Sequence, residues 1–143
     1  MPYSEEIKLA IIIIAIVAAY VLLIKPRLQK RKQKLLNRFL HIQSLSLNMQ
    51  DTLLKHVLKY DAMNDEVAPG VTFKTYLRNL QRNHAAHLSD KHYKRLKNQN
   101  VVFFSLKINR MLNLQQEKLK LVMRELSHLE SFSQIRHPES VNY

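Results

Sequence analysis

An uninterrupted apolar stretch near the N-terminus, Leu9–Ile24, contains no charged and no amide side chain. As a helix this stretch is about 24 Å long, and adding Ile7 and Lys8, whose ammonium group can extend outward, brings it to about 27 Å. The hydrocarbon core of a bilayer is about 30 Å thick. The stretch therefore predicts a single transmembrane helix, and we assign residues 1–25 to an N-terminal membrane anchor.

The residues on either side of the anchor distinguish it from a cleaved signal peptide. A secretory signal has a basic leader, whereas Glu5 and Glu6 accompany Lys8 here. The apolar stretch ends in Leu-Leu-Ile-Lys-Pro, which lacks the small residues of a cleavage site. We therefore expect the helix to stay in the membrane.

A cluster of basic residues, called the juxtamembrane cluster below, follows the anchor directly. No acidic residue occurs between it and Asp51. Because basic flanks are retained on the cytoplasmic side, we expect the C-terminal domain in the cytoplasm and the N-terminus outside. An inner (cytoplasmic) membrane fits this topology, and an organellar inner membrane is the alternative. The cluster consists of Lys25, Arg27, Lys30, Arg31, Lys32 and Lys34.

Apolar residues between Arg27 and Met63 recur in steps of three and four, which predicts helix. They form two adjacent rows, and such a broad stripe favours a helical bundle over a two-stranded coiled coil. The first row contains Leu28, Leu35, Phe39, Ile42, Met49, Leu53, Tyr60 and Met63. The second row contains Leu36, Leu40, Leu47, Leu54 and Leu58.

Two features interrupt this helical pattern. Pro26 disfavours helical geometry at Lys25, so we expect a kink or a short break there before a helix restarts near Arg27. Asn48 and Asp51 resemble the start of a helix, so residues 27–63 form either one helix or two.

A Pro-Gly pair within residues 64–71 predicts a turn between helices, and no segment of the chain has a convincing strand pattern. Thr72 is a suitable N-cap for a helix that ends near Leu88. Ser89 and Asp90 are suited to begin a short second helix.

The last predicted helix, residues 101–132, is the most regular. Its seam rises in steps of four and three, and we expect it to be buried against the helix that begins near Arg27. Gln115 is a polar member of this seam and needs a hydrogen-bonding partner. In an antiparallel pair of helices, Gln43 and Ser46 would lie opposite it and complete a polar layer. The apolar seam residues are Ile108, Leu112, Leu119, Val122, Leu126 and Leu129.

These elements predict an all-α protein: one N-terminal transmembrane helix followed by a small cytoplasmic bundle of three to four helices, two of them long and amphipathic. We assign residues 26–132 to the helical domain and residues 133–143 to a flexible C-terminal tail.

Composition limits the chemistry of this chain. The absence of cysteine excludes disulfides, thiolate nucleophiles and cysteine-ligated metal sites. The formal net charge of +12 at pH 7 favours an anionic partner, such as acidic lipid, nucleic acid or an acidic protein. For the juxtamembrane cluster itself, a role in topology alone is the simpler interpretation.

A second group of basic residues lies between Lys74 and Lys97 and is the candidate contact site for phosphate groups or lipid. Tyr76 and Tyr93 are interleaved with it and could stack on bases, but packing into the bundle is the favoured interpretation. Nucleic acid is the less favoured ligand, because no helix-turn-helix, zinc finger or glycine-rich loop accompanies the group. The group consists of Lys74, Arg78, Arg82, Lys91, Lys94, Arg95 and Lys97.

Three histidines and an aspartate, His84, His87, Asp90 and His92, are the candidate metal ligands. The basic residues around them would repel a divalent cation, and no HExxH pattern is present. We therefore assign no metal site. Nor does the chain contain a serine placed with histidine and acid as a triad, so no catalytic residue and no cofactor is assigned.

An apolar cluster, Val101, Val102, Phe103 and Phe104, is either a hydrophobic plug of the bundle or a contact site, and we take it as the candidate partner contact. With the excess of apolar positions on the two long helices, it indicates that a protein partner covers part of the bundle. The sequence therefore predicts a membrane-anchored adaptor, assembly factor or accessory subunit that is not an enzyme. A membrane-tethered module that binds anionic lipid or nucleic-acid phosphates is the alternative, and a second copy of the chain is another candidate partner.

Overall fold

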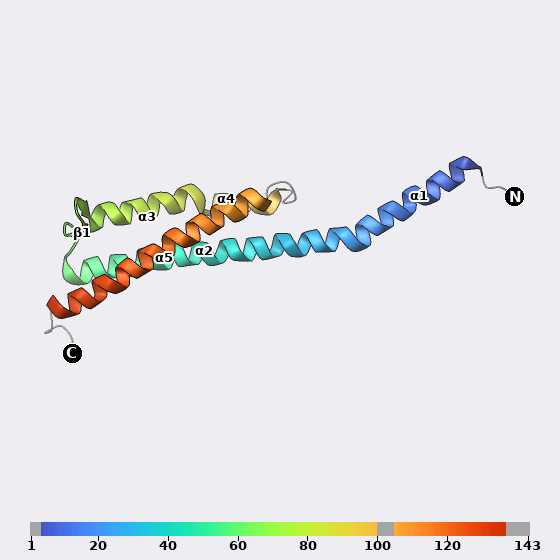
Figure 1. The fold of residues 1–143 in the computed structure, drawn as a ribbon. Coiled ribbons are helices and arrows are strands. Elements are labelled where there is room, and N and C mark those ends of the chain that lie inside the picture. The colour runs from blue at the N-terminus through green and yellow to red at the C-terminus, as the bar shows by residue number, and fades with distance from the viewer. Residues whose placement is uncertain (1–3, 100–104, 137–143) are drawn as a thin grey trace.

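The protein is all-α, with a long N-terminal helix that leads into a small helical bundle (Figure 1). This computed structural model describes residues 4–99 and 105–136, and for residues 130–136 it describes the backbone alone. The predicted fold class is confirmed.

One continuous helix runs from Glu5 to Tyr60. It comprises α1 (Glu5–Ala19), a π-helical turn η1 (Tyr20–Ile24) and α2 (Lys25–Tyr60). The stretch that the sequence left open as one helix or two is therefore one helix, and Asn48 and Asp51 lie within it.

The expected break at Pro26 is absent, and the chain passes through this residue as a helix. Lys25 keeps helical dihedral angles, φ −54° and ψ −48°. A proline inside a helix lacks an N–H donor, and its ring crowds the carbonyl group four residues earlier, here that of Leu22. The π-helical turn η1 widens the backbone at this place and accommodates the ring. Figure 1 shows the helix changing direction there, so the proline produces a bend without a break.

The N-terminal part of this helix is long and apolar enough to cross a membrane, with a mean hydropathy of 3.0 over its most apolar window. None of that window is buried inside the protein. Side chains from Ser4 to Arg27 are exposed, and the first buried residue of the long helix is Leu35.

The bundle consists of α2, α3 (Phe73–His87), α4 (Asp90–Asn98) and α5 (Ser105–Arg136). Figure 1 shows that α3 and α4 run back along α2, and that α5 then runs in the same direction as α2. The two long helices are therefore parallel, because the α3–α4 segment returns the chain to the end of the bundle nearer α1. The antiparallel arrangement considered for them is wrong.

A left-handed residue and a small hairpin join α2 to α3. Asp61, at φ 49°, ends α2, and the N–H group of Ala62 donates to the carbonyl oxygen of Val57 at 3.1 Å. The strands β1 (Glu66–Ala68) and β2 (Val71–Thr72) then pair antiparallel. The sequence predicted only a turn here, because strands of three and two residues are too short to show alternation.

The residues of this hairpin account for its tight turn and for the start of α3. Pro69 and Gly70 occupy its tip, and Gly70 has φ 75°, which suits the third position of a type II turn. Thr72 caps α3 as predicted, since its Oγ1 accepts a hydrogen bond from the N–H group of Thr75 at 3.3 Å.

The helix α5 extends to Arg136, past the boundary expected near Phe132.

The hydrophobic core lies between α2, α3 and α5. The predicted seam of α5 is confirmed: Leu112, Leu119, Val122 and Leu126 are buried, and Ile108 and Leu129 are partly buried. From α2 the core takes mainly the first apolar row. The largest fully buried apolar side chains are Phe39, Ile42, Leu53, Val57, Leu88, Leu112 and Leu119.

Candidate functional site

The second apolar row of α2 lies mostly outside the core. Leu36 is buried, but the next four members of the row are exposed, and we call these four the leucine row. Leu40, Leu47 and Leu54 follow one another every seven residues, or about 10 Å along the helix, and Leu58 is one turn further on. Their exposed fractions are 41% for Leu40, 50% for Leu47, 39% for Leu54 and 70% for Leu58. An apolar stripe of this length on the outside of a bundle is typical of a surface that another protein covers.

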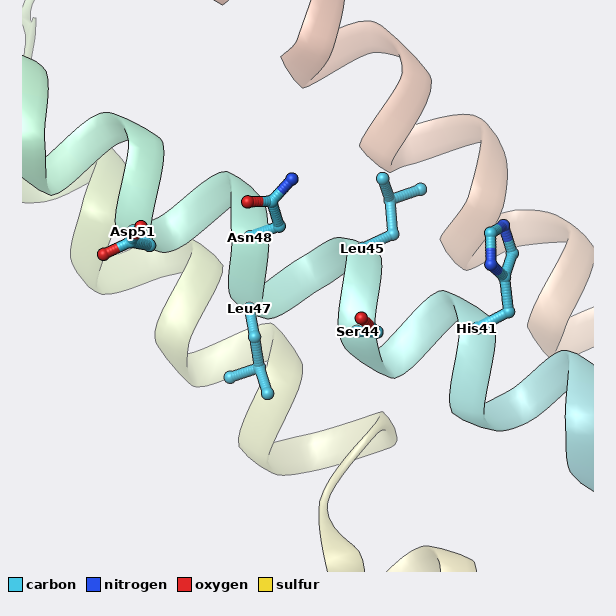
Figure 2. A pocket seen from close by; sticks show the side chains of 6 residues that line it. All are labelled: His41, Ser44, Leu45, Leu47, Asn48 and Asp51. Atoms are coloured by element: carbon cyan, nitrogen blue, oxygen red, sulfur yellow. The ribbon is translucent and has the colours of Figure 1, made fainter.

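An open depression of about 530 Å³ lies beside the middle of this row. All six residues that line it belong to α2, and Figure 2 shows Leu45 and Leu47 pointing to opposite sides of the helix with Ser44 between them. The short side chains of Ser44 and Asn48, one helical turn apart, leave space between the longer ones. The remaining lining residues are His41 and Asp51.

The ionisable groups of the depression, His41 and Asp51, lie apart from each other. Asp51 is paired with Lys55, with 2.6 Å between the carboxylate oxygen and the ammonium nitrogen. His41 lies ten positions before Asp51 on the same helix, and Figure 2 shows the two side chains at opposite ends of the depression. The arrangement lacks a histidine and acid in contact, and the leucines beside it are suited to packing.

Two of the candidate metal ligands, His84 and Asp90, bond to side chains of α2, whereas His92 bonds within the start of α4. The Nδ1 atom of His84 is 3.1 Å from the hydroxyl oxygen of Ser46, and that of His92 is 2.8 Å from the hydroxyl oxygen of Ser89. Asp90 accepts a hydrogen bond of 2.8 Å from the side-chain amide of Gln43. Within residues 4–99 and 105–136, no three histidine, cysteine or acidic residues are placed to hold a metal ion together.

The hydrogen bonds of His84 and Asp90 belong to a polar layer across the bundle. Gln115 is buried in α5, and its Oε1 accepts a hydrogen bond of 2.6 Å from the side-chain amide of Asn83 in α3. His84, next to Asn83, contacts Ser46 of α2. The predicted polar layer therefore exists, but α3 supplies the partner of Gln115, and Gln43 and Ser46 bond instead to Asp90 and His84.

His84 and Tyr76 of the bundle have shifted pKa values. Burial lowers the pKa of His84 below its ordinary value of 6.5, and attraction to Asp90 opposes this shift. Burial, followed by the hydrogen bond that Tyr76 donates to the Glu125 carboxylate, raises the pKa of Tyr76 above its usual range. The predicted packing of the tyrosines is confirmed for Tyr76, and for Tyr93, whose ring centroid is 5.9 Å from that of Phe39.

The structure divides the predicted phosphate-binding group between two places. Lys74, Arg78 and Arg82 lie on α3, exposed and directed away from the core. The other four are exposed on α4, at the end of the bundle nearer α1 (Figure 1). These four are Lys91, Lys94, Arg95 and Lys97.

The juxtamembrane cluster lies close to the α4 group. It occupies the first turns of α2, before the first buried residue, and Lys32 donates a hydrogen bond of 3.1 Å to the carbonyl oxygen of Gln99, just after α4. The predicted partner contact, Val101 to Phe104, lies outside the described residues.

An arginine that the sequence analysis did not single out connects α2 to α5. The guanidinium group of Arg38 donates to Asn109 at 3.5 Å, to Asn113, and to Gln116 at 2.9 Å. The three amide residues are spaced by four and three along α5, which places them on one helical face. That spacing was the available sequence signal for this contact.

Comparison with known proteins finds no matching family model, no similar curated protein and no similar solved structure.

Proposed function

We propose that this protein is a membrane-anchored adaptor or accessory subunit, and that its helical bundle binds a protein partner along the leucine row of α2. The observation that carries the proposal is the exposure of four large apolar side chains on one face of a folded helix. Such a protein acts by contact and not by catalysis.

The energetics of the leucine row support this role. Full burial of one leucine side chain contributes about 1.5 to 3 kcal/mol, so covering the exposed halves of four leucines contributes a few kcal/mol to binding. Leu47 borders the depression formed around Ser44 and Asn48, where a partner side chain has room to enter. A large apolar group that enters such a space is the usual centre of a protein interface.

The arrangement of charges supports the proposed topology. Five of the six residues of the juxtamembrane cluster are exposed on the first turns of α2 and Lys32 is half-buried, whereas Glu5 and Glu6 begin α1 at the other end of the apolar helix. The positive-inside rule then places the bundle on the cytoplasmic side of an inner membrane, or in the matrix of an organelle. A reporter enzyme that is active only in the cytoplasm should therefore work when it is fused to the C-terminus. Digestion of the bundle by protease added outside intact cells would contradict this topology.

Affinity purification after mild detergent extraction tests the adaptor role. The full-length chain should recover defined protein subunits, and Leu47→Ser combined with Leu54→Ser should lose them. The matched control replaces Leu114 and Leu121 by serine, because these α5 leucines are each 56% exposed. Equal recovery by both double variants would contradict a role for the leucine row. A complex that contains only a second copy of the chain would identify a homo-oligomer.

A further inference from the structure

We infer that the end of the bundle nearer the anchor is a second membrane-contact site, at which α4 binds anionic lipid headgroups of the bilayer that holds α1. This site combines the juxtamembrane cluster with the four basic residues of α4. The inference depends on insertion of the apolar helix and not on the partner proposed for the leucine row.

The position of α4 follows from its contacts with α2. Asp90, at the start of α4, accepts a hydrogen bond from Gln43, and the carbonyl oxygen of Gln99, after its end, accepts one from Lys32. The end of the apolar stretch is Ile24, so Lys32 is eight residues and Gln43 nineteen residues beyond it. Along a continuous helix these separations are about 12 Å and about 28 Å. The C-terminal end of α4 is therefore the end nearest the membrane.

The shorter of these distances, about 12 Å, brings the end of α4 close enough to the lipid headgroups for electrostatic attraction. The headgroup layer of one leaflet is about 5 to 8 Å thick, and charges at a surface act over about 8 Å at physiological ionic strength. With α2 along the bilayer normal, the last turn of α4 is within one screening length, about 8 Å, of the headgroups. Its basic residues near that end are Lys94, Arg95 and Lys97.

The three basic residues of α3 are too far away to contribute. His84 contacts Ser46, and the ring of Phe73 is 5.5 Å from that of His56, so α3 lies beside residues 46–56 of α2. These positions are about 33 to 48 Å beyond Ile24 along the helix. Several screening lengths therefore separate the basic residues of α3 from the lipid.

The local charge balance also favours an anionic surface. The first turns of α2 contain six basic residues and α4 contains four. The only acidic residue in these two segments is Asp90. Asp90 lies at the far end of α4 and is bonded to Gln43. In the described part of the chain, none of the α4 basic residues forms an ion pair. Basic residues beside a cytoplasmic leaflet each contribute about fivefold to binding of anionic lipid.

The test uses the full chain in vesicles and a fluorophore at a single introduced cysteine, since the chain has no cysteine of its own. Asn98→Cys places the reporter on the exposed end of α4, and Gln81→Cys places a control reporter on exposed α3. Quenching by nitroxide-headgroup lipid then measures how close each helix is to the surface. Vesicle flotation confirms insertion in every case.

The α4 reporter should be quenched more strongly in phosphatidylcholine mixed with phosphatidylserine than in phosphatidylcholine alone, and high salt should remove the difference. The ratio of docked to undocked bundle should fall at least about fivefold when the α4 residues are reversed. Reversal of the three α3 residues is the matched control and should change nothing. The variants are Lys94→Glu, Arg95→Glu and Lys97→Glu for α4, and Lys74→Glu, Arg78→Glu and Arg82→Glu for α3.

The inference is overturned if quenching is independent of anionic lipid, if the α4 reversal leaves it unchanged, or if the α3 reversal reduces it equally. It is also overturned if an RNA oligonucleotide binds through the α4 residues while lipid has no effect. Glutamine replacements at the same α4 positions, checked by circular dichroism, show whether loss of charge or loss of folding is responsible. The partner captured through the leucine row should be unaffected by the α4 variants, so the two proposals fail separately.

Discussion

Asn83 of α3 donates a hydrogen bond of 2.6 Å to Gln115 of α5, and Gln115 is 1% exposed. This pair satisfies a polar side chain that occupies a position of the apolar seam. A buried amide without a partner costs about 1 to 3 kcal/mol, so the pair favours the one alignment of α3 and α5 in which the two amides meet.

A double-mutant cycle should detect this pair. Replacement of Asn83 or Gln115 by alanine should each destabilise the bundle, and the two changes together should cost about 0.5 to 1.5 kcal/mol less than their sum. Denaturation followed by circular dichroism in detergent gives the free energies of unfolding. Asn79→Ala, at an exposed position one turn earlier on α3, is the control and should show no coupling to Gln115. Additive effects at Asn83 and Gln115 would mean that the pair does not contribute.

Core packing of α5 can be tested with two leucines that are two positions apart. Leu119 is 2% exposed and Leu121 is 56% exposed. Leu119→Ala should lower the free energy of unfolding by about 2 to 5 kcal/mol, whereas Leu121→Ala should change it by no more than about 0.5 kcal/mol. Comparable losses for the two variants in thermal or chemical denaturation would show that α5 is not packed through this seam.

The sequence was sufficient to predict the buried face of α5. Its seam from Ile108 to Leu129 rises in steps of four and three and is apolar except at Gln115, and such a pattern specifies which face of a helix is covered. Leu112 and Leu119 are accordingly buried. The direction of α5 could not be predicted in this way, because the pattern is the same for a parallel and an antiparallel neighbour. The partner of Gln115 depends on that arrangement and was therefore assigned to α2 instead of α3.

The two apolar rows of α2 show a second limit of sequence patterns. Both rows are apolar, but the neighbouring helices cover mainly the row of Phe39 and Leu53, and Leu47 and Leu54 remain exposed. Periodicity identifies apolar positions, whereas the number and width of neighbouring helices decide which of them are covered. The break between α3 and α4 at Leu88 and Ser89, which divides the basic residues between two helices, was in contrast predictable from the capping residues Ser89 and Asp90.

Stability should depend on pH through His84. Its pKa is lowered in the folded state, mainly by burial, so the unfolded chain binds a proton more readily. The stability that neutral His84 contributes is fully present above pH 6.5, the pKa of this residue in the unfolded chain. It is lost as pH falls from there toward the lower pKa of the folded state. Unfolding measured across this window should show a smaller pH dependence for His84→Gln than for the wild type. His87→Gln, at an exposed position on the same helix, is the control.

Arg38 should hold α5 in register with α2, because its guanidinium group donates to amides on successive turns of α5, including Gln116 at 2.9 Å. Arg38→Met keeps much of the apolar stem and should cost about 1 to 2 kcal/mol through loss of these hydrogen bonds. Arg38→Lys keeps the charge but cannot place several donors in one plane, so it should recover little of that loss. Lys34→Met, at an exposed position one turn earlier, should be nearly neutral. Hydrogen exchange at residues 109–116 should become faster in the Arg38 variants and should not change in Lys34→Met. An equal increase in Lys34→Met would show that the arginine has no special role.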